Sequence, residues 1–264
     1  MRVGSLEVLP VLDGSARVPA SDALRRVGSE GTQAWAAHEQ FLVDGTFLDL
    51  SLGGFLIRMG ERVVLVDLGV GMVDRPPFKG GQMLDSLRAY GVSPDDVTDV
   101  LFTHLHFDHV GWATQHGRVV FANATHRCHR ADWDHFVTGD DPKAAAKLAP
   151  LTDRMEFWEA DSTLAPGLDV VGAPGHTPGS TIMVVSSGSE RAMLLGDVVH
   201  CPVELVEDDW EALFDVDPLL ARHTREALAR ELEGTDVAIA AAHFPGLEFG
   251  RLLPGTPTRT FLYS

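Results

Sequence analysis

The stretch THLHFDHVGW, residues 103–112, places three histidines and an aspartate within six positions directly after an apolar run. Imidazole nitrogens and carboxylate oxygens are the usual protein ligands of divalent transition metals. His104 and His106 are two residues apart, so in extended backbone both side chains point to the same side. Asp108 and His109 follow where the chain is expected to turn. The stretch therefore predicts a metal site at a strand end, although histidines at a strand end can also be ordinary surface groups.

Three other apolar runs each lead to a single ligand-type residue. They are VVGAPGHTPGST (170–181) with His176, MLLGDVVH (193–200) with Asp197, and AIAAAHFPG (238–246) with His243. Each of these residues follows an apolar strand and is bordered by turn residues, which is how an active-site rim is built on a sheet scaffold. We expect the three loops to join the 103–112 stretch in one site.

The remaining pattern predicts strands early in the chain and helices placed between strands after residue 80. The strands are expected at 5–12, 53–59, 62–69, 97–103, 168–173, 180–187, 191–199 and 236–244, with a hairpin at Gly60 and Glu61. One helix is expected at 81–92. Others are expected to begin after the capping pattern Ser93, Pro94 and Asp96, at Asp141–Pro142, and at Asp217–Pro218, the last of them ending at Gly234. This pattern predicts an α+β fold of sheets packed face to face under helical layers. Gly and Pro are spread throughout, which favours a single domain over 1–264.

The charge balance argues against several classes of partner. The chain has 21 basic and 38 acidic residues, a formal net charge of -17, which repels phosphate backbones and anionic lipids. No stretch approaches the roughly 20 apolar residues of a transmembrane helix, and residues 1–14 lack a long apolar signal region. We therefore expect a cytoplasmic protein that binds neither nucleic acid nor membrane. The two cysteines, Cys128 and Cys201, are expected to be reduced thiols.

The motifs HLHFDH (104–109), PGHTPGS with His176, LGDVVH with Asp197 and AAHFPG with His243 resemble those of the metallo-β-lactamase superfamily of hydrolases. The resemblance covers residues 50 to 250 and implies a four-layer αβ/βα sandwich with a dinuclear site between the sheets. It implies that His104, His106 and His176 hold one metal, that Asp108, His109 and His243 hold the other, and that Asp197 bridges them. It also implies that Asp67, in VLVDLGVG, supports the ligands from behind.

Two cations about 3.5 to 4 Å apart would keep a bridging hydroxide at neutral pH and polarise a carbonyl. Such a donor set suits Zn²⁺, while Mn²⁺, Fe²⁺ or Co²⁺ would also bind. The motifs are most similar to the branch of acyl-homoserine lactonases and of phosphotriesterases such as methyl parathion hydrolase. The resemblance thus implies a small-molecule lactone or ester as substrate and suggests a homodimer. The alternatives are a phosphotriester or aryl-ester hydrolase, a glyoxalase II-like thioesterase and an iron-dependent redox enzyme.

We take Asp108 and His200 as the catalytic residues. His200 lies three residues after Asp197, where the lactonases often carry a tyrosine and the phosphotriesterase relatives a histidine, and it can act as a hydrogen-bond donor or general acid. A buried ring without a catalytic role is the equal alternative.

Several other side chains are assigned from their positions in the sequence. Trp112 is predicted to line the substrate pocket and Phe107 to pack in the core. Residues 20–50 are predicted to form a lid or a dimerisation segment, and Trp35, Phe41 and Phe47 would form the lid. The cluster HRCHRADWDHF (126–136) is predicted to be an exposed helix with ordinary histidines, His126, His129 and His135.

Overall fold

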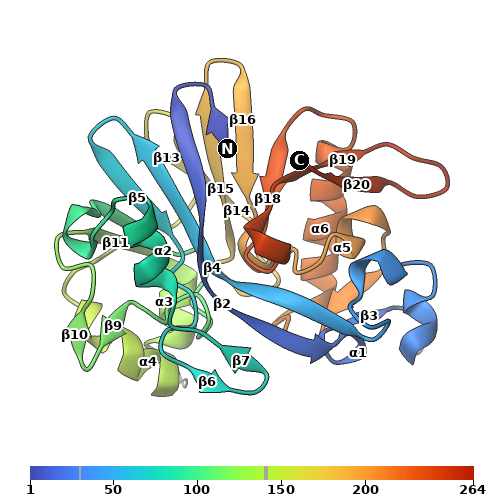
Figure 1. Cartoon of the computed structure of the whole chain (residues 1–264), viewed down its shortest axis with the longest axis horizontal. Helices are drawn as coiled ribbons and strands as arrows, with labels where there is room; N and C mark the ends of the chain where they lie inside the picture. The colour runs from blue at the N-terminus through green and yellow to red at the C-terminus, as the bar shows by residue number, and fades with distance from the viewer. Residues whose placement is uncertain (30, 140–141) are drawn as a thin grey trace.

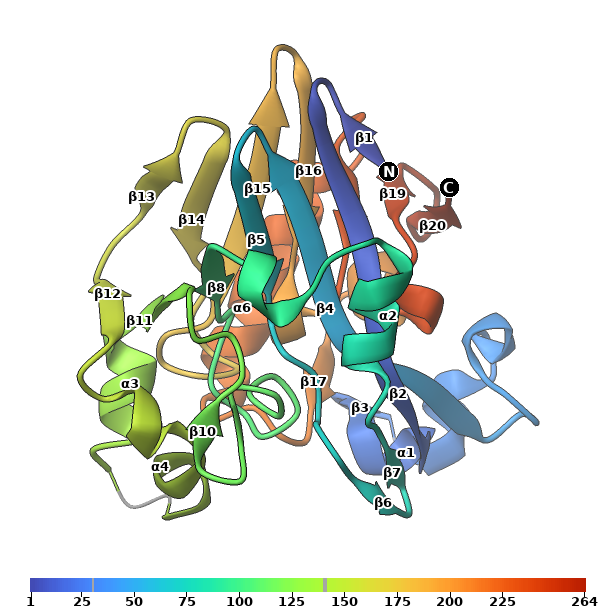
Figure 2. The ribbon, with the colours of Figure 1, turned by 60° about the vertical axis from the view of Figure 1, so that its left-hand side comes forward.

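Two sheets face each other in the computed structural model, which describes residues 1–29, 31–139 and 142–264 (Figures 1 and 2). The first sheet has the order β12-β11-β8-β5-β4-β2-β7-β6, with β1 paired to β2. Its strands are β1 Arg2–Val3, β2 Leu6–Pro19, β4 Phe47–Met59, β5 Arg62–Val66, β6 Asp74–Arg75, β7 Phe78–Lys79, β8 Asp99–Leu101, β11 Thr125–His129 and β12 Met155–Trp158. The second sheet has the order β13-β14-β15-β16-β18-β19-β20. Its strands are β13 Ser162–Ala165, β14 Leu168–Gly172, β15 Thr181–Ser187, β16 Glu190–Leu194, β18 Ala238–Ala240, β19 Gly250–Leu253 and β20 Thr260–Tyr263.

Helices cover the outer faces of both sheets. The α-helices are α1 Ala20–Ala23, α2 Met83–Ala89, α3 Arg130–Phe136, α4 Pro142–Leu148, α5 Val203–Val206 and α6 Pro218–Leu232. The 3₁₀ turns are η1 Gly31–Trp35, η2 Glu39–Phe41, η3 Pro94–Asp96, η4 Ala149–Leu151, η5 Gly196–Val198 and η6 Pro245–Leu247. Two small ribbons pair β9 Thr114–Gln115 with β10 Arg118–Val119, and β3 Leu24–Arg26 with β17 Trp210–Ala212. Figure 1 shows α2, α3 and α4 on one side of the strands and α6 on the other.

The alternation of side chains along the strands explains this layering. On β15, Met183 and Val185 enter the core between the two sheets, while Ile182 and Val184 pack in the core that α6 covers. On the first sheet, Leu65 and Val100 pack in a third core, together with side chains of α2 and α3. The order of layers is therefore helix, sheet, sheet, helix, and the predicted α+β, four-layer αβ/βα sandwich is confirmed.

Strand direction brings the predicted site residues to one end of the sheets. β5, β8, β11 and β12 are parallel neighbours in the first sheet, and β16 and β18 are parallel in the second. β14 is antiparallel to β15, which is antiparallel to β16, so β14 runs in the same direction as β16 and β18. The loops that follow these strands therefore meet at their carboxyl ends, where ligand sites of such sheets are commonly found.

Two strands are much longer than the sequence predicts. β2 continues to Pro19 and β4 begins at Phe47, and the two pair along their whole length around a bulge between Leu12 and Gly14. The bulge changes the register, so the apolar alternation that predicts 5–12 does not continue through it. The extended parts of β2 and β4 reach beyond the sandwich toward β6, β7 and α1 (Figure 2).

The predicted helix boundaries agree with the structure where capping residues are present. Asp217 caps α6 by accepting a hydrogen bond from the Leu220 N–H at 3.0 Å. Ser93 and Asp96 form the predicted capping box, although the element they begin is the short turn η3. The predicted start of a helix at Asp141 lies outside the described residues, and α4 begins at Pro142.

Candidate metal centre

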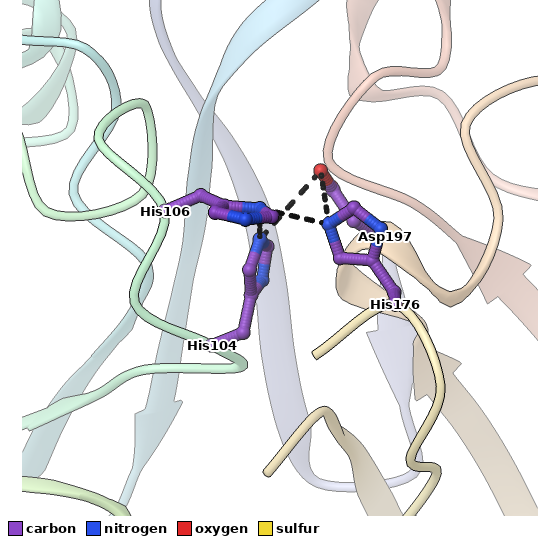
Figure 3. Close-up of side chains that lie close together, drawn as sticks. All are labelled: His104, His106, His176 and Asp197. Atoms are coloured by element: carbon purple, nitrogen blue, oxygen red, sulfur yellow. Dashed lines mark hydrogen bonds and ion pairs between the residues drawn. The ribbon is translucent and has the colours of Figure 1, made fainter. Parts of the chain in front are cut away.

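The four loops bring all seven predicted ligands together. His104, His106, His176 and Asp197 form one group, and Asp108, His109 and His243 form a second. Within each group, one ligand atom from every residue lies within 4.8 Å of the others. Figure 3 shows the first group, with His104 and His106 on one loop facing His176 and Asp197 on two others.

Ring nitrogens converge in the first group. His106 Nδ1 lies 3.1 Å from His104 Nε2 and 2.9 Å from His176 Nε2. Asp197 Oδ2 lies 3.7 Å from His104 Nε2 and 3.6 Å from His176 Nε2. Because an unprotonated ring nitrogen carries a lone pair, nitrogens at these distances repel one another unless a proton or a cation lies between them. The arrangement is the one that a cation-binding site requires.

Asp197 also reaches the second group. Its Oδ2 lies 3.0 Å from His243 Nε2, and its Oδ1 lies 3.2 Å from His109 Nε2. His243 Nε2 is 3.6 Å from Asp108 Oδ2. The 3.2 Å contact between His109 Nε2 and Asp197 Oδ1 does not have hydrogen-bond geometry, and among the described residues neither buried atom has another hydrogen-bond partner. Buried polar atoms are normally satisfied, so these two atoms fit the donors of a divalent cation.

Three histidines of the site are each oriented through the other ring nitrogen. His109 Nδ1 lies 2.9 Å from Asp67 Oδ2, the carboxylate predicted to support the ligands. His176 Nδ1 lies 2.9 Å from Asp215 Oδ1, and His243 Nδ1 lies 2.9 Å from the Ser51 carbonyl oxygen. Such contacts fix the ring tautomer and the ring direction, which strengthens metal ligation. Asp215 is not among the residues predicted from the sequence.

Burial and charge set the protonation of these rings. Burial and the neighbouring His176 lower the pKa of His106 to about 3, so its imidazole is neutral at pH 7, as a metal ligand must be. For His109, burial opposes protonation, but the carboxylates of Asp197 and Asp67 outweigh it and raise the pKa. The site therefore combines a neutral His106 ring with buried carboxylates that attract positive charge.

His200 lies beside the two groups. Its Nε2 is 3.5 Å from Asp197 Oδ2, and its ring stacks on His243 with centroids 5.8 Å apart. Glu204 Oε2 accepts a hydrogen bond from the His200 backbone N–H at 2.6 Å and lies 3.6 Å from Nδ1. Burial lowers the pKa of His200, but Glu204 and Asp197 outweigh this effect and raise it to about 9. The side chain is placed to donate a proton or a hydrogen bond.

A cavity of about 150 Å³ opens over the ligands. Its lining combines six site residues with six apolar side chains. The site residues are His106, Asp108, His176, Asp197, His200 and His243, and the apolar residues are Val18, Leu50, Leu52, Phe78, Phe107 and Phe214. A second cavity of about 150 Å³ shares Leu50, His200 and His243 with it and is lined by Phe41. A larger cavity of about 640 Å³ lies between β14–β16 and α6 and contains none of the predicted ligands.

The predictions for Phe107 and Trp112 are both wrong. Phe107 is 55% exposed, lines the cavity and packs edge-on against Phe78 at 5.1 Å. Trp112 is 3% exposed and packs in the core under the helices. The chain turns at residues 107–109, so Leu105 packs in the core while Phe107, two residues further on, is exposed. That turn cannot be read from residue type.

Asp13, at the bulge of β2, explains the position of Trp112. Its buried carboxylate accepts five hydrogen bonds, from the backbone N–H groups of Val70, Gly71, Gly81 and Met83 and from Trp112 Nε1. It thereby fixes the segment between β5 and α2, which carries Phe78, to the loop after the 104–109 motif. The sequence analysis missed Asp13 because an Asp-Gly pair after a strand is typical of a turn.

Asp132, on α3, is a second buried carboxylate that the sequence analysis missed. It accepts hydrogen bonds from the Leu105 N–H at 3.0 Å, the Thr177 hydroxyl at 3.0 Å and the Gly179 N–H at 2.6 Å. A Cβ on Gly179 would lie 2.8 Å from Asp132 Oδ1, so glycine permits this close approach. Asp132 thus ties the loop of His104 and His106 to the loop of His176.

An Asp132→Asn variant tests this tie. We expect it to lose about 1–3 kcal/mol of unfolding free energy, because its amide would face N–H donors and leave one unsatisfied. We also expect its zinc affinity to fall about 10–100-fold, as for other groups that orient metal ligands. Urea unfolding and competition with a chelator measure both effects. Asp134→Asn, at an exposed position of the same helix, is the control; equal results for the two variants would refute the tie.

The prediction of an exposed helix over 126–136 is wrong for its first part. His126 and His129 lie on β11, and His126 is fully buried with Nδ1 3.1 Å from the Ala124 carbonyl oxygen. The His129 side chain caps α3 by accepting from the Ala131 N–H, and His135 is exposed on that helix. Among the described residues, the two groups that could hold a metal ion include none of these three histidines.

The predicted lid residues differ in their surroundings, although Trp35 and Phe41 pack in one hydrophobic cluster. Trp35 is buried against Trp210 with ring centroids 4.7 Å apart, and Phe47 begins β4. Phe41 lines the second cavity beside His200. The lid and dimerisation roles of residues 20–50 stay predictions.

Fold and site together define a four-layer αβ/βα protein with a candidate two-metal centre at the carboxyl ends of its strands. The sequence profile described as the metallo-beta-lactamase superfamily matches residues 54–243, most of the chain. The chain therefore belongs to the metallo-beta-lactamase superfamily, which confirms the resemblance of its motifs.

Two of the similar proteins are named as lactonases. An N-acyl homoserine lactonase of a Bacillus species is 27% identical over 171 residues, which cover 58% of this chain and 66% of that protein. Metallo-beta-lactamase domain-containing protein 1 of Mus musculus is 28% identical over 253 residues, which cover 89% of this chain and 82% of that protein. The structure of AidC, a dizinc quorum-quenching lactonase, matches with a TM-score of 0.86 at 23% identity over 100% of this chain and 96% of that one. Superfamily and relatives together support the prediction of a hydrolase.

Both cysteines, Cys128 and Cys201, are buried free thiols. Within residues 1–29, 31–139 and 142–264, the structure contains no helix that is long and apolar enough to span a bilayer.

Proposed function

We propose that this protein is a dinuclear metal-dependent hydrolase that opens lactones or related carboxylic esters. In this proposal His104, His106 and His176 hold one cation, Asp108, His109 and His243 hold the other, and Asp197 bridges them. The observation that carries the proposal is the cavity, which is lined both by histidines and carboxylates of the site and by apolar side chains. An uncharged substrate with an apolar substituent fits such a lining.

The donors fit two divalent cations. Five imidazoles and two carboxylates suit Zn²⁺, and Mn²⁺, Fe²⁺ and Co²⁺ can use the same donors. Two such cations, when bound, lower the pKa of a water between them and polarise a carbonyl oxygen. The carboxylate of Asp67 and the carbonyl of Ser51 hold His109 and His243 in the ligating tautomer.

His200 and Asp108 are the side chains that we assign to proton handling. His200 lines the cavity and would donate a hydrogen bond to the substrate carbonyl or a proton to the leaving alkoxide. Asp108 lines the same cavity and would accept a hydrogen bond from the attacking water.

The walls of the cavity suggest where the rest of the substrate lies. Phe107 and Phe214 line the cavity and are both more than half exposed, so they can cover an acyl or aryl group at the entrance. N-acyl homoserine lactones, the substrates named for the Bacillus relative, combine a lactone with such an acyl group. A phosphotriester or aryl ester is the second candidate, favoured by a histidine at position 200 in place of the tyrosine of many lactonases. The predicted homodimer and cytoplasmic location stay predictions.

A substrate panel with metal analysis tests the proposed function. We expect the purified protein to contain about two divalent metals per chain and to hydrolyse members of a panel of N-acyl homoserine lactones, simple lactones, aryl esters and phosphotriesters. A strong chelator should abolish turnover and Zn²⁺ should restore it, because the cations supply the activated water. Less than one metal per chain, or turnover that survives chelation, would contradict the proposal.

A further inference from the structure

Arg225, on α6, is a fully buried cation directly behind the candidate site. Its side chain is 2% exposed, and its Nε lies 3.3 Å from Glu204 Oε1 while Nη2 lies 3.1 Å from Asp215 Oδ2. The guanidinium also donates to the backbone carbonyls of Trp210 and of Val198, the residue after Asp197. Removing a charge from water costs several kcal/mol unless it is paired and hydrogen-bonded. These four contacts therefore indicate that the surroundings of residue 225 are arranged specifically for an arginine side chain.

The first carboxylate connects Arg225 to a candidate metal ligand. Asp215 Oδ2 faces Arg225, and Asp215 Oδ1 lies 2.9 Å from His176 Nδ1. The opposite nitrogen of that ring, Nε2, faces His106 and Asp197 (Figure 3). The direction of the His176 ring thus depends on an Asp215 side chain that Arg225 holds in place.

The second carboxylate connects Arg225 to the candidate proton donor. Glu204 Oε1 faces Arg225, and Glu204 Oε2 accepts hydrogen bonds from the backbone N–H groups of His200 at 2.6 Å and Cys201 at 3.0 Å. The same oxygen lies 3.6 Å from His200 Nδ1. In each of the two carboxylates, one oxygen therefore faces Arg225 and the other contacts a histidine of the site.

We propose that Arg225 is a positioning residue that sets the metal ligand His176 and the substrate-facing His200 together, through Asp215 and Glu204. The proposal rests on the proposed function, since it assigns to both histidines the roles given there. A neutral side chain at 225 would leave two buried carboxylates without their shared cation, and each would be free to turn away from its histidine. A residue that merely packs α6 against the sheet would affect folding and leave the metal site unchanged.

Three variants and one double variant separate these roles. Arg225→Met removes the charge at similar length, Arg225→Lys keeps the charge without the planar fork, and Asp215→Asn removes the contact to His176. Arg222→Met is the matched control, because Arg222 is on the same helix but pairs with Glu211 and Glu226 instead of with Glu204 and Asp215. Zinc affinity is measured by competition with a chromophoric chelator, folding by urea unfolding of the metal-free protein, and kcat and KM with the best substrate of the panel.

We expect Arg225→Met to weaken zinc binding about 10–100-fold, with Arg225→Lys intermediate and Arg222→Met within about 3-fold of the wild type. Combining Arg225→Met with Asp215→Asn should weaken zinc binding no more than the stronger single variant, because both act through one contact. At saturating zinc, kcat of Arg225→Met should stay reduced through Glu204 and His200, with KM changed less.

Wild-type zinc affinity in Arg225→Met, or additive losses in the double variant, would overturn the proposal. If Arg225→Met fails to fold, Arg225→Lys decides, since wild-type zinc affinity in that variant refutes the role. A wild-type protein that binds zinc but hydrolyses nothing in the panel would refute the proposed function, while the zinc measurements would still decide the role of Arg225.

Discussion

An Asp197→Asn variant is expected to bind no more than one metal per chain and to lose on the order of 10³-fold or more in kcat/KM. Asparagine keeps the size of the side chain but removes the negative charge between the two groups of ligands. Asp197 Oδ2 lies 3.6 Å from His176 Nε2 in the first group and Oδ1 lies 3.2 Å from His109 Nε2 in the second, so both groups lose a donor at once. Replacing a residue that only orients a metal ligand typically lowers metal affinity or activity about 10–100-fold, and replacing a ligand shared by both groups should lower it further.

Metal content by elemental analysis and steady-state kinetics on the best substrate of the panel check this expectation. Asp236→Asn is the control, because it makes the same chemical change at a fully exposed carboxylate paired with Arg251. Circular dichroism of both variants shows whether the fold is kept. Two metals per chain and near wild-type turnover in Asp197→Asn would refute the proposal that Asp197 bridges the two metals.

The candidate ligand residues, which the fold brings together, could be proposed from the sequence because each depends on a local signal. An apolar strand followed by a turn and a histidine or aspartate is visible in a dozen residues, as at His176 and His243. The layers could be predicted for the same reason, since strand alternation and helix caps such as Asp217 are local. What the local pattern does not show is the partner that each loop meets across the fold.

The residues that the sequence analysis missed act over long separations. Asp13 accepts from Trp112 Nε1, 99 positions away, and Asp132 accepts from the Thr177 hydroxyl, 45 positions away. In the sequence, Asp13 belongs to an Asp-Gly pair that is typical of a turn, and Asp132 lies in a segment that is typical of the polar face of an exposed helix. Arg225 likewise has the helical spacing of an exposed charge on α6 but is buried. Such roles follow from the packing of distant loops, which residue type and periodicity do not encode.

Removal of the metals is expected to lower the stability of the protein strongly, because the site is costly to fold without them. His106 Nδ1 lies within 3.1 Å of ring nitrogens of both His104 and His176, and the carboxylate of Asp197 is buried beside them. A ligand that binds only the folded chain adds RT ln(1 + [L]/Kd), about 4 kcal/mol for each site when free metal exceeds its Kd 1,000-fold. Urea unfolding with a chelator should therefore give a much lower midpoint than unfolding in micromolar zinc, with a similar slope.

The same titration separates site binding from general effects of zinc. Asp197→Asn should gain clearly less stability from zinc than the wild type, while Asp236→Asn should gain as much. Because imidazole ligands must be deprotonated to bind, the stabilisation should shrink as the pH falls. Equal midpoints with chelator and with zinc in the wild type would show that the converging histidines are stable without a cation. In that case His104, His106 and His176 would hold protons between their ring nitrogens instead, and the hydrolytic site would need another arrangement.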